Sequence, residues 1–140
     1  MACAPRRSSR SPGERTVRVE ILRVDGDRVA FATDHGTAVA GWDGPAPTVG
    51  RVYYVELGTH DDIEWGRGIV AIAAGPTRIA AHGDGVVVDA VLEQYDPSYG
   101  RAVLRLGRGI FWFTTTGAPP PVGSWVRVQV ATLTLYDTRI

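Results

Sequence analysis

Arginine and aromatic residues are concentrated between residues 101 and 127, where they could bind a nucleic acid. In proteins that bind single strands, aromatic rings stack on the bases while Arg contacts the phosphates. Consecutive aromatic residues in a β-strand point alternately to its two faces, so at least one ring of the run at 111–113 leaves the core face. The predicted nucleic-acid-binding residues are Arg101, Arg105, Arg108, Phe111, Trp112, Phe113 and Arg127. The alternative is that these rings fill a contact between two β-units, because aromatic side chains also supply core and interface area.

Other chemistry-bearing residues do not form a recognisable motif. The residues of metal-ligating type are His60, Asp61, Asp62, Glu64, His82 and Asp84. Their spacing matches no tight metal motif, so a solvated loop is the simpler interpretation. Cys3 and His35 have no evident catalytic partner, and the sequence contains neither a Gly-x-Ser-x-Gly elbow nor a phosphate-binding loop. We therefore expect a non-enzymatic protein without catalytic residues, metal or cofactor.

The composition limits the class of protein. The chain has 140 residues, 44% of them hydrophobic, which suffices for a packed core and argues against a wholly disordered chain. Its formal net charge is zero, which excludes a strongly basic nucleic-acid binder. All fifteen basic residues are Arg. Arg suits bidentate contacts with anions, but this usage, with abundant Ala, Gly, Val and Pro, is also typical of a GC-rich genome.

The sequence predicts a soluble, cytoplasmic protein. Its one Cys, Cys3, lies near the N-terminus, so neither an internal disulfide nor a Cys-based zinc site is possible. No apolar run is long enough to span a membrane, and the N-terminal arginines are not followed by the apolar segment of a secretory signal. No membrane partner is therefore expected.

Alternating apolar and polar residues, interrupted by Gly, Pro and Asp, predict an all-β fold. The expected strands are 16–24, 28–33, 37–42, 51–59, 63–74, 77–82, 86–93, 101–106, 109–115 and 124–135. No segment has a sustained 3.6-residue period with caps, so we expect little or no helix. Strand 109–115 carries the Phe-Trp-Phe run and must position its rings.

One sequence pattern occurs twice, which predicts an internal repeat. Residues 44–63 and 117–135 align at an offset of 73 residues, so that Gly50 matches Gly123 and Thr59 matches Thr132. Further upstream the offset becomes 69, and Val17-Arg18-Val19-Glu20 aligns with Val86-Val87-Val88-Asp89. This alignment gives the second copy four extra residues in its first turn, where loops tolerate insertion. We therefore predict a disordered tail at 1–15 and two sequence-related β-units at 16–74 and 75–140.

Each copy contains a three-strand meander, a loop rich in Pro and Gly, and a long strand that opens Val-Gly-x-x-Val-x-Val. In this order of elements the copies resemble the OB-fold family, especially its S1-like and cold-shock-like small β-barrels. The aromatic RNA-binding motifs of cold-shock domains are absent, and a Pro-rich loop replaces the helix that many OB-folds place before the fourth strand. An SH3-like barrel, or one continuous sandwich built from both copies, fits the same strand order.

The OB-fold resemblance implies a ligand face on the second and third strands of the second unit, where the Arg and aromatic residues lie. The first unit has Ala38, Val39 and Ala40 at the matching positions, which cannot stack on bases. Its residues 16–74 hold five Arg and nine acidic residues, a net charge of −4, whereas residues 75–140 hold six Arg and five acidic residues. We therefore expect the second unit to bind single-stranded nucleic acid. The alternative is a protein–protein interaction module, such as an assembly, inhibitor or immunity-type factor. The oligomeric state does not follow from the sequence.

Overall fold

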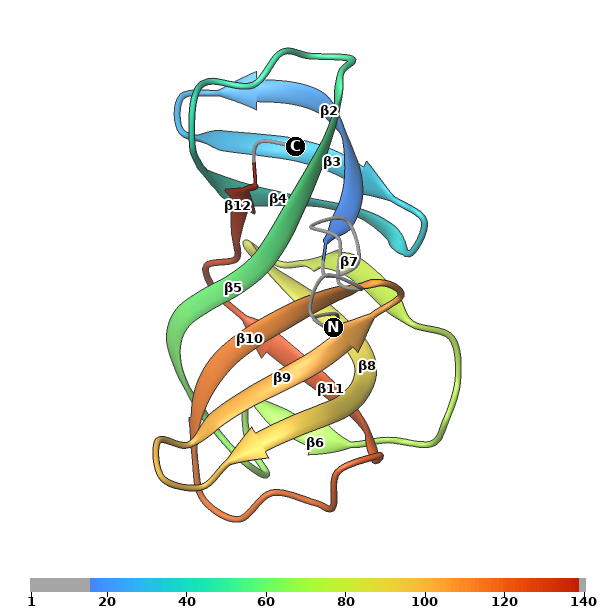
Figure 1. Cartoon of the computed structure of the whole chain (residues 1–140), viewed down its shortest axis with the longest axis vertical. Coiled ribbons are helices and arrows are strands. Elements are labelled where there is room, and N and C mark those ends of the chain that lie inside the picture. Colours follow the sequence, from blue (N-terminus) through green and yellow to red (C-terminus); the bar gives the residue numbers. More distant parts are fainter. Residues whose placement is uncertain (1–15, 139–140) are drawn as a thin grey trace, which may run out of the picture.

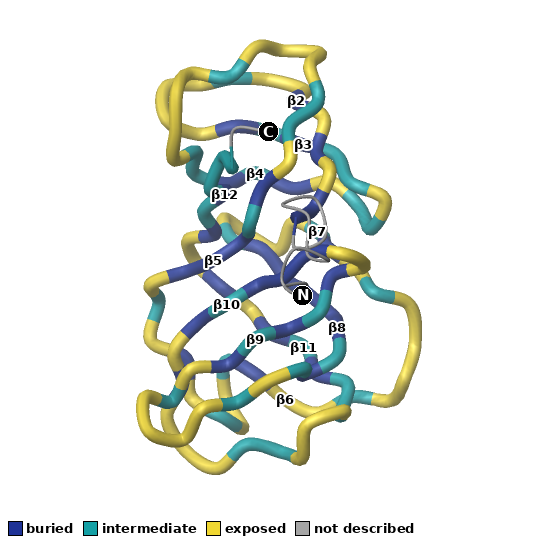
Figure 2. Tube along the Cα trace, in the orientation of Figure 1, coloured by how far each residue is buried: buried dark blue, intermediate teal, exposed yellow. Residues whose placement is uncertain are grey.

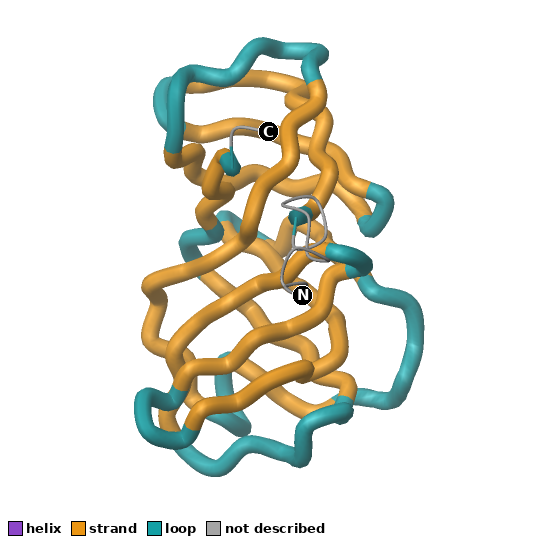
Figure 3. The backbone as a smooth tube through the Cα atoms, viewed as in Figure 1, coloured by secondary structure: helices purple, strands orange, loops and turns teal. Residues whose placement is uncertain are grey.

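The computed structural model describes residues 16–138, and these form β-strands joined by turns and loops, without a helix (Figure 3). The all-β prediction is therefore confirmed. The predicted tail at 1–15 lies outside the described residues, as do Arg139 and Ile140. Within residues 16–138 there is no helix that is long and apolar enough to cross a membrane.

Eleven strands form one mixed sheet. Their bounds are β2 (Val17–Asp25), β3 (Arg28–Thr33), β4 (Gly36–Asp43), β5 (Val52–Glu64), β6 (Ile69–Ala71), β7 (Arg78–His82), β8 (Gly85–Asp96), β9 (Arg101–Leu106), β10 (Gly109–Thr116), β11 (Trp125–Val130) and β12 (Thr134–Asp137). Alternation of apolar and polar residues explains most of them, since β2 buries Val17, Val19 and Ile21 while the residues between are exposed.

The first part of the sheet closes on itself. β2 pairs with β3, and β3 pairs with β4, both antiparallel. β12 then lies between β4 and β5, parallel to β4 and antiparallel to β5. The N-terminal half of β5 returns to β2, which completes a ring of five strands. Because β12 comes from the end of the chain, the strand pairing crosses the expected boundary between 16–74 and 75–140.

The second part of the sheet is partly closed and receives the other half of β5. From Leu57 onward β5 pairs in parallel with β10, and the order continues through β9, β8 and β11 to β6. An isolated bridge between Trp65 and Ile69 brings the end of β5 beside β6. Figure 1 shows the two parts stacked along the long axis of the molecule, with β5 running from one into the other.

The register corrects the alignment of 17–20 with 86–89. In the first part Val17 pairs with Val55, and in the second part Val88 pairs with Val128. Val55 and Val128 keep the 73-residue offset, so Val17 corresponds to Val88, not to Val86. The offset before the first turn is therefore 71, and the turn holds two extra residues, not four. The sequence does not distinguish the offsets 69 and 71, because a shift of two residues leaves every side chain on the same face of a strand.

Three predicted strands differ from their expected bounds. Of the strand expected at 63–74, only the end of β5 and the short β6, Ile69–Ala71, are in strands. β5 was expected to end at residue 59 but continues to Glu64, so residues 60–62 belong to a strand and not to a loop. The strand expected at 124–135 divides into β11 and β12, with a bend at 131–133. At the bend, one carboxylate oxygen of Asp61 accepts hydrogen bonds from the backbone nitrogens of Ala131 and Thr132, at 2.7 and 3.1 Å. The backbone N–H groups of Ala131 and Thr132 would have bonded to a neighbouring strand if the strand had continued, and Asp61 satisfies them instead.

The core runs through the interior of both parts without a break (Figure 2). Its largest fully buried side chains include Phe31 in the first part and Phe111 and Phe113 in the second. Leu57 and Ile63 of β5 belong to the same buried set, so this strand contributes to both ends of the core. The continuous core fixes β10 and β5 side by side, and this pair carries the candidate site.

Candidate nucleic-acid interface

Trp112 is the aromatic residue of β10 that leaves the core. Its side chain is half-buried and lies on the outer face of the β5–β10 pair, where Trp112 is the register partner of Gly58. A Cβ atom on Gly58 would lie 2.8 Å from Cδ2 of the indole and closer still to Cε2 and Cζ2. Only glycine therefore lets the indole lie against the backbone of β5. The expectation that one ring of the Phe-Trp-Phe run points outward holds for Trp112.

Three side chains from three other strands surround this indole. The guanidinium carbon of Arg101, on β9, lies over the ring at 4.8 Å from its centroid. His60 of β5 approaches edge-on, and Tyr136 of β12 lies at a tilt of 32°, each with its ring centroid 5.4 Å from that of Trp112. The hydroxyl of Tyr136 and Nε2 of His60 are 3.2 Å apart and share a hydrogen bond. We call Trp112, Arg101, His60 and Tyr136 the Trp112 cluster.

Partial burial also affects the phenol of the cluster. Burial is the main cause that raises the pKa of Tyr136 above its usual value, and the nearby Asp43 acts in the same direction. The phenol therefore stays neutral at ordinary pH and serves as a hydrogen-bonding group. The cluster thus offers aromatic surface and one permanent cation, Arg101, which suits a flat ring that carries a nearby anion.

Phe111 and Phe113 are not available to a ligand, which corrects their predicted role. Both are fully buried, and their rings pack against each other with centroids 5.1 Å apart. Trp112, which lies between them, points to the opposite face because side chains alternate along a strand. The prediction counted all three rings because the sequence does not show which face of β10 is the core face.

Two of the predicted arginines are held by carboxylates. Nη2 of Arg105 lies 2.5 Å from Oε2 of Glu93 on the neighbouring strand β8. Arg127 of β11 donates two hydrogen bonds to the carboxylate of Asp89 on β8, at 2.7 and 2.9 Å. These pairs remove most of the attraction that either arginine would exert on a phosphate. Arg108 is exposed in the turn between β9 and β10, and its backbone oxygen accepts a hydrogen bond from Arg105.

Asp89 is a buried carboxylate held by two cations. Its side chain is 8% exposed, and Arg78 of β7 lies 3.5 Å from it on the side opposite Arg127. The hydrogen bond from Arg127 is the main cause that lowers the pKa of Asp89; burial opposes this effect only in part. Asp89 therefore stays ionised through the neutral range and joins β7, β8 and β11.

Sequence reasoning missed His60 and Tyr136 as members of the cluster. From the sequence, His60 belongs only to the metal-ligating residue types, and Tyr136 is not assigned to a site. No signal in the sequence places them beside Trp112, because both contacts depend on β5 and β12 crossing between the two parts. Within residues 16–138, no three His, Cys, Asp or Glu side chains are grouped so that they could hold a metal ion.

A scan against protein-family models found no match, and searches of curated proteins and of solved structures found no significant match.

Proposed function

We propose that this protein is a non-enzymatic binding protein and that the Trp112 cluster binds single-stranded nucleic acid. The observation that carries the proposal is the Arg101 guanidinium lying over an outward-facing indole on the face of β9 and β10. In this proposal the second part of the sheet acts as an OB-like unit, in which these two strands form the ligand face. One base would stack in the cluster, and Arg101 would contact its phosphate.

The geometry defines how a base would enter. The indole lies against Gly58, and the guanidinium of Arg101 lies over its ring. Arg101 is exposed and has no carboxylate within salt-bridge distance among the residues described. Its side chain can therefore swing away from the ring, give its place to a base, and pair with the phosphate of the same nucleotide. His60 and Tyr136 would then contact the edge of the stacked base.

The free charge at the site predicts weak dependence on salt. Arg105 and Arg127 are already paired with carboxylates, so Arg101 is the cation of the cluster that remains for a phosphate. One phosphate contact on a single strand corresponds to a slope of about −0.7 in log K against log salt concentration. Affinity should therefore come mainly from stacking, roughly 1–3 kcal/mol per base.

We also propose that the two parts are OB-like units derived from one repeated sequence. Two matched hydrogen bonds support this, since the backbone nitrogen of Gly50 donates to Ile21 at 2.7 Å and that of Gly123 donates to Leu92 at 2.8 Å. The matched residues Thr59 and Thr132 also meet, with the hydroxyl of Thr59 2.6 Å from the carbonyl of Thr132. Two related units that meet about a pseudo-twofold axis would bring matched residues into contact in this way.

A protein partner at the same surface is the second candidate. The observation that favours it is the pairing of Arg105 with Glu93, which leaves an aromatic surface with little net charge. Protein interfaces of this kind are enriched in Trp, Tyr and Arg. A neutral aromatic surface binds a protein without the dependence on salt that a phosphate contact requires.

Titration with labelled oligonucleotides separates the two candidates. We expect a fluorescein-labelled ten-nucleotide strand to bind, with about tenfold or greater loss of affinity in Trp112→Ala. The matched control for Arg101 is Arg28, which is exposed on β3 at the position 73 residues earlier. Arg101→Gln should weaken binding and flatten the salt slope, whereas Arg28→Gln should change neither. Absence of binding by the parent protein at low salt would refute the nucleic-acid proposal and leave the protein-partner candidate.

A further inference from the structure

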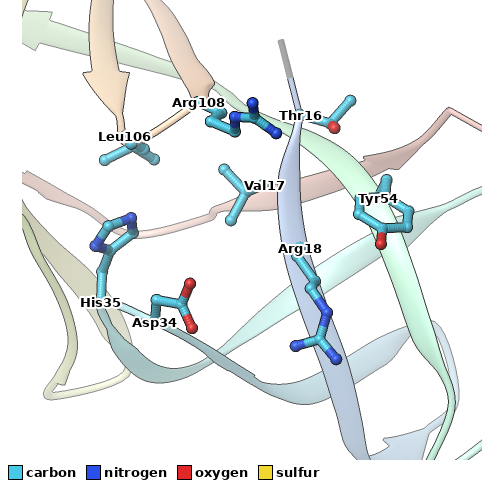
Figure 4. Close-up of a pocket in the computed structure, with 9 residues that line it drawn as sticks. Thr16, Val17, Arg18, Asp34, His35, Tyr54, Leu106 and Arg108 are labelled. Atoms are coloured by element: carbon cyan, nitrogen blue, oxygen red, sulfur yellow. The ribbon is translucent and has the colours of Figure 1, made fainter. Parts of the chain in front are cut away.

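A groove of about 550 Å³ lies between the two parts of the sheet, away from the Trp112 cluster (Figure 4). One wall is the start of β2, with Thr16, Val17 and Arg18. The opposite walls are the turn between β3 and β4, which contributes Asp34, and the turn between β9 and β10, which contributes Arg108. Neither Arg18 nor Arg108 has a carboxylate within salt-bridge distance among residues 16–138. The groove therefore combines apolar walls with two available cations.

Among residues 16–138, no strand lies beside the edge of β2 that borders this groove. β2 pairs with β5 from Val17 onward, but its pairing with β3 on the other edge begins only at Glu20. No described strand pairs with Val17–Val19 on that second edge. An unpaired stretch of this kind can accept an extended peptide as an additional strand.

The matching edge of β8 is covered by β7. Val88 corresponds to Val17 in the register of the sheet, and β7 places Ile79 beside Val88. Ile79 is 1% exposed, and its backbone nitrogen donates a hydrogen bond to the carbonyl of His35 at 2.9 Å. The pairing of β7 with β8 thus indicates how an occupant of the groove would pair with β2. It would run antiparallel to β2 and bury an apolar side chain beside Val17.

The charges at the two edges are opposite. On β8 the residue after Val88 is Asp89, and β7 places Arg78 against it at 3.5 Å. On β2 the residue after Val17 is Arg18, and it is exposed. An occupant of the groove should therefore carry a carboxylate opposite Arg18, where β7 carries a guanidinium opposite Asp89.

The groove is closed at one end, which fixes the point at which an occupant must end. A Cβ atom on Gly109 would lie 2.7 Å from the backbone carbon of Thr16 and 2.8 Å from the nitrogen of Val17. No chain can pass between Gly109 and Thr16, so an added strand must end beside Val17. Figure 4 shows the guanidinium of Arg108 beside Thr16 at this closed end. A chain terminus there would place its α-carboxylate next to Arg108.

We propose that this groove binds the C-terminal residues of a partner protein, with an acidic residue next to last and an apolar residue last. The acidic side chain pairs with Arg18, the apolar side chain lies beside Val17, and the terminal carboxylate pairs with Arg108. This site is separate from the Trp112 cluster, so it does not depend on the proposed nucleic-acid binding.

The N-terminal residues of the chain itself suit the groove poorly. At the offset of 71 that holds in β2, Arg7 and Ser8 would take the places of Arg78 and Ile79. Arg7 would then face Arg18, and Ser8 would not fill the apolar position. The segment 1–15 also carries four Arg and one Glu, the same sign of charge as the groove. A separate acidic C-terminus is therefore the better match.

The test uses a synthetic peptide designed from β7 and the full 140-residue chain. The probe is an N-terminally labelled pentapeptide with the sequence of residues 75–79, Glu in place of Arg78, and a free C-terminal carboxylate. We expect it to shift the backbone amide signals of residues 16–18 and 106–108 in nitrogen-15 NMR spectra. Three control peptides carry a C-terminal amide, the original Arg, or a Ser in place of Ile79. Each should bind about tenfold more weakly.

Variants of the protein test the proposed pairing. Arg18→Glu should reverse the preference, so that the peptide with Arg binds more tightly than the peptide with Glu. Arg23→Glu is the matched control, since Arg23 is also exposed on β2 but does not line the groove. Asp34→Asn removes the one acidic side chain of the groove and should tighten binding of the acidic peptide several-fold.

Several outcomes would overturn the proposal. Equal affinity for the free acid and the amide would show that no C-terminal carboxylate is recognised. Signal changes confined to other residues would place the peptide elsewhere. Nuclear Overhauser contacts between residues 1–15 and the turn at Arg108 in the free protein would show that the chain itself fills the groove. Tighter binding of a ten-nucleotide strand at the same amide signals would assign the groove to phosphate.

Discussion

β4 and β10 occupy corresponding places in the two parts of the sheet but carry side chains of very different size. β4 has Ala38, Val39 and Ala40 where β10 has Phe111, Trp112 and Phe113. The small residues suffice in the first part because the ring is filled by Phe31 from β3 and by Leu135 from β12. In the second part the rings of β10 themselves fill the interior. The same backbone pairing is therefore stabilised from different strands, and the first part has Val39 where the second part has the outward-facing indole of Trp112.

The edge of β2 beside the groove and the matching edge of β8 differ in the same way. On one side Asp89 lies between Arg127 and Arg78, with β7 in place. On the other side the corresponding pair is Arg18 and Tyr54, which are register partners and form no ion pair in the structure. Matched positions with different side chains thus distinguish the edge of β8 that β7 covers from the edge of β2 that no described strand covers, which is the edge we propose for binding.

Phe113→Ala gives the second part the residue that the first part has at the matching position, Ala40. Because Phe113 is fully buried, we expect a loss of about 3–5 kcal/mol in the free energy of unfolding, from lost burial and from the cavity. Urea unfolding measures it. Val103→Ala on the outer face of β9 is the control and should cost less than about 1.5 kcal/mol. A loss below about 1 kcal/mol for Phe113→Ala would show that β10 does not fill the second core.

Gly58→Ala tests the contact that brings the indole against β5. The added Cβ atom would overlap Trp112, so the ring must move, and we expect a destabilisation of roughly 1–3 kcal/mol. In a Trp112→Ala background the overlap is absent, and the same substitution should cost much less. Gly75→Ala is the control, since nothing lies within 4 Å of a Cβ atom there. Additive effects of Gly58→Ala and Trp112→Ala would show that the two residues do not compete for this space.

Asp89→Asn should weaken the closed edge at neutral pH. The amide cannot hold two guanidinium groups as the carboxylate does, and we expect a loss of about 1–2 kcal/mol because both arginines can still reach water. Chemical unfolding at pH 7 measures the loss. Glu64→Gln is the control, since its pair with Arg67 is exposed on both sides and should contribute less than about 0.5 kcal/mol.

The same carboxylate predicts a dependence on pH. The pKa of Asp89 is lower in the folded chain than in the unfolded chain, where it is about 3.9. Its contribution to stability is therefore present above about pH 4 and is lost as the pH falls through the lowered pKa. The parent protein should lose stability more steeply than Asp89→Asn between about pH 4 and 2. Parallel curves for the two proteins over this interval would contradict the assignment.

The positions of the strands could be predicted from the sequence more fully than their pairing in the sheet. Alternation in 17–21 and the Gly and Asp turns placed most strands within a few residues. The exchange of β5 and β12 between the two parts could not be predicted, because it depends on pairing between residues far apart in the chain. For the site, the sequence indicated Trp112 and Arg101. It did not indicate His60 and Tyr136, since their contacts with Trp112 follow from that exchange.

The smallest predicted effect concerns Arg101 and its counterpart Arg28. Both are exposed at the first position of their strands, but Arg101 lies over an indole while the residue that matches Trp112 beside Arg28 is Val39. A cation over an aromatic ring at a surface stabilises a protein by about 0.5–1 kcal/mol. A double-mutant cycle of Arg101→Gln with Trp112→Leu should therefore give a coupling free energy of this size, and a cycle of Arg28→Gln with Val39→Leu should give none. Both cycles are measured by urea unfolding at 0.1 and 1 M salt. Equal coupling in the two cycles would mean that Arg101 gains nothing from the indole, and would contradict the observation on which the proposed binding by the second part rests.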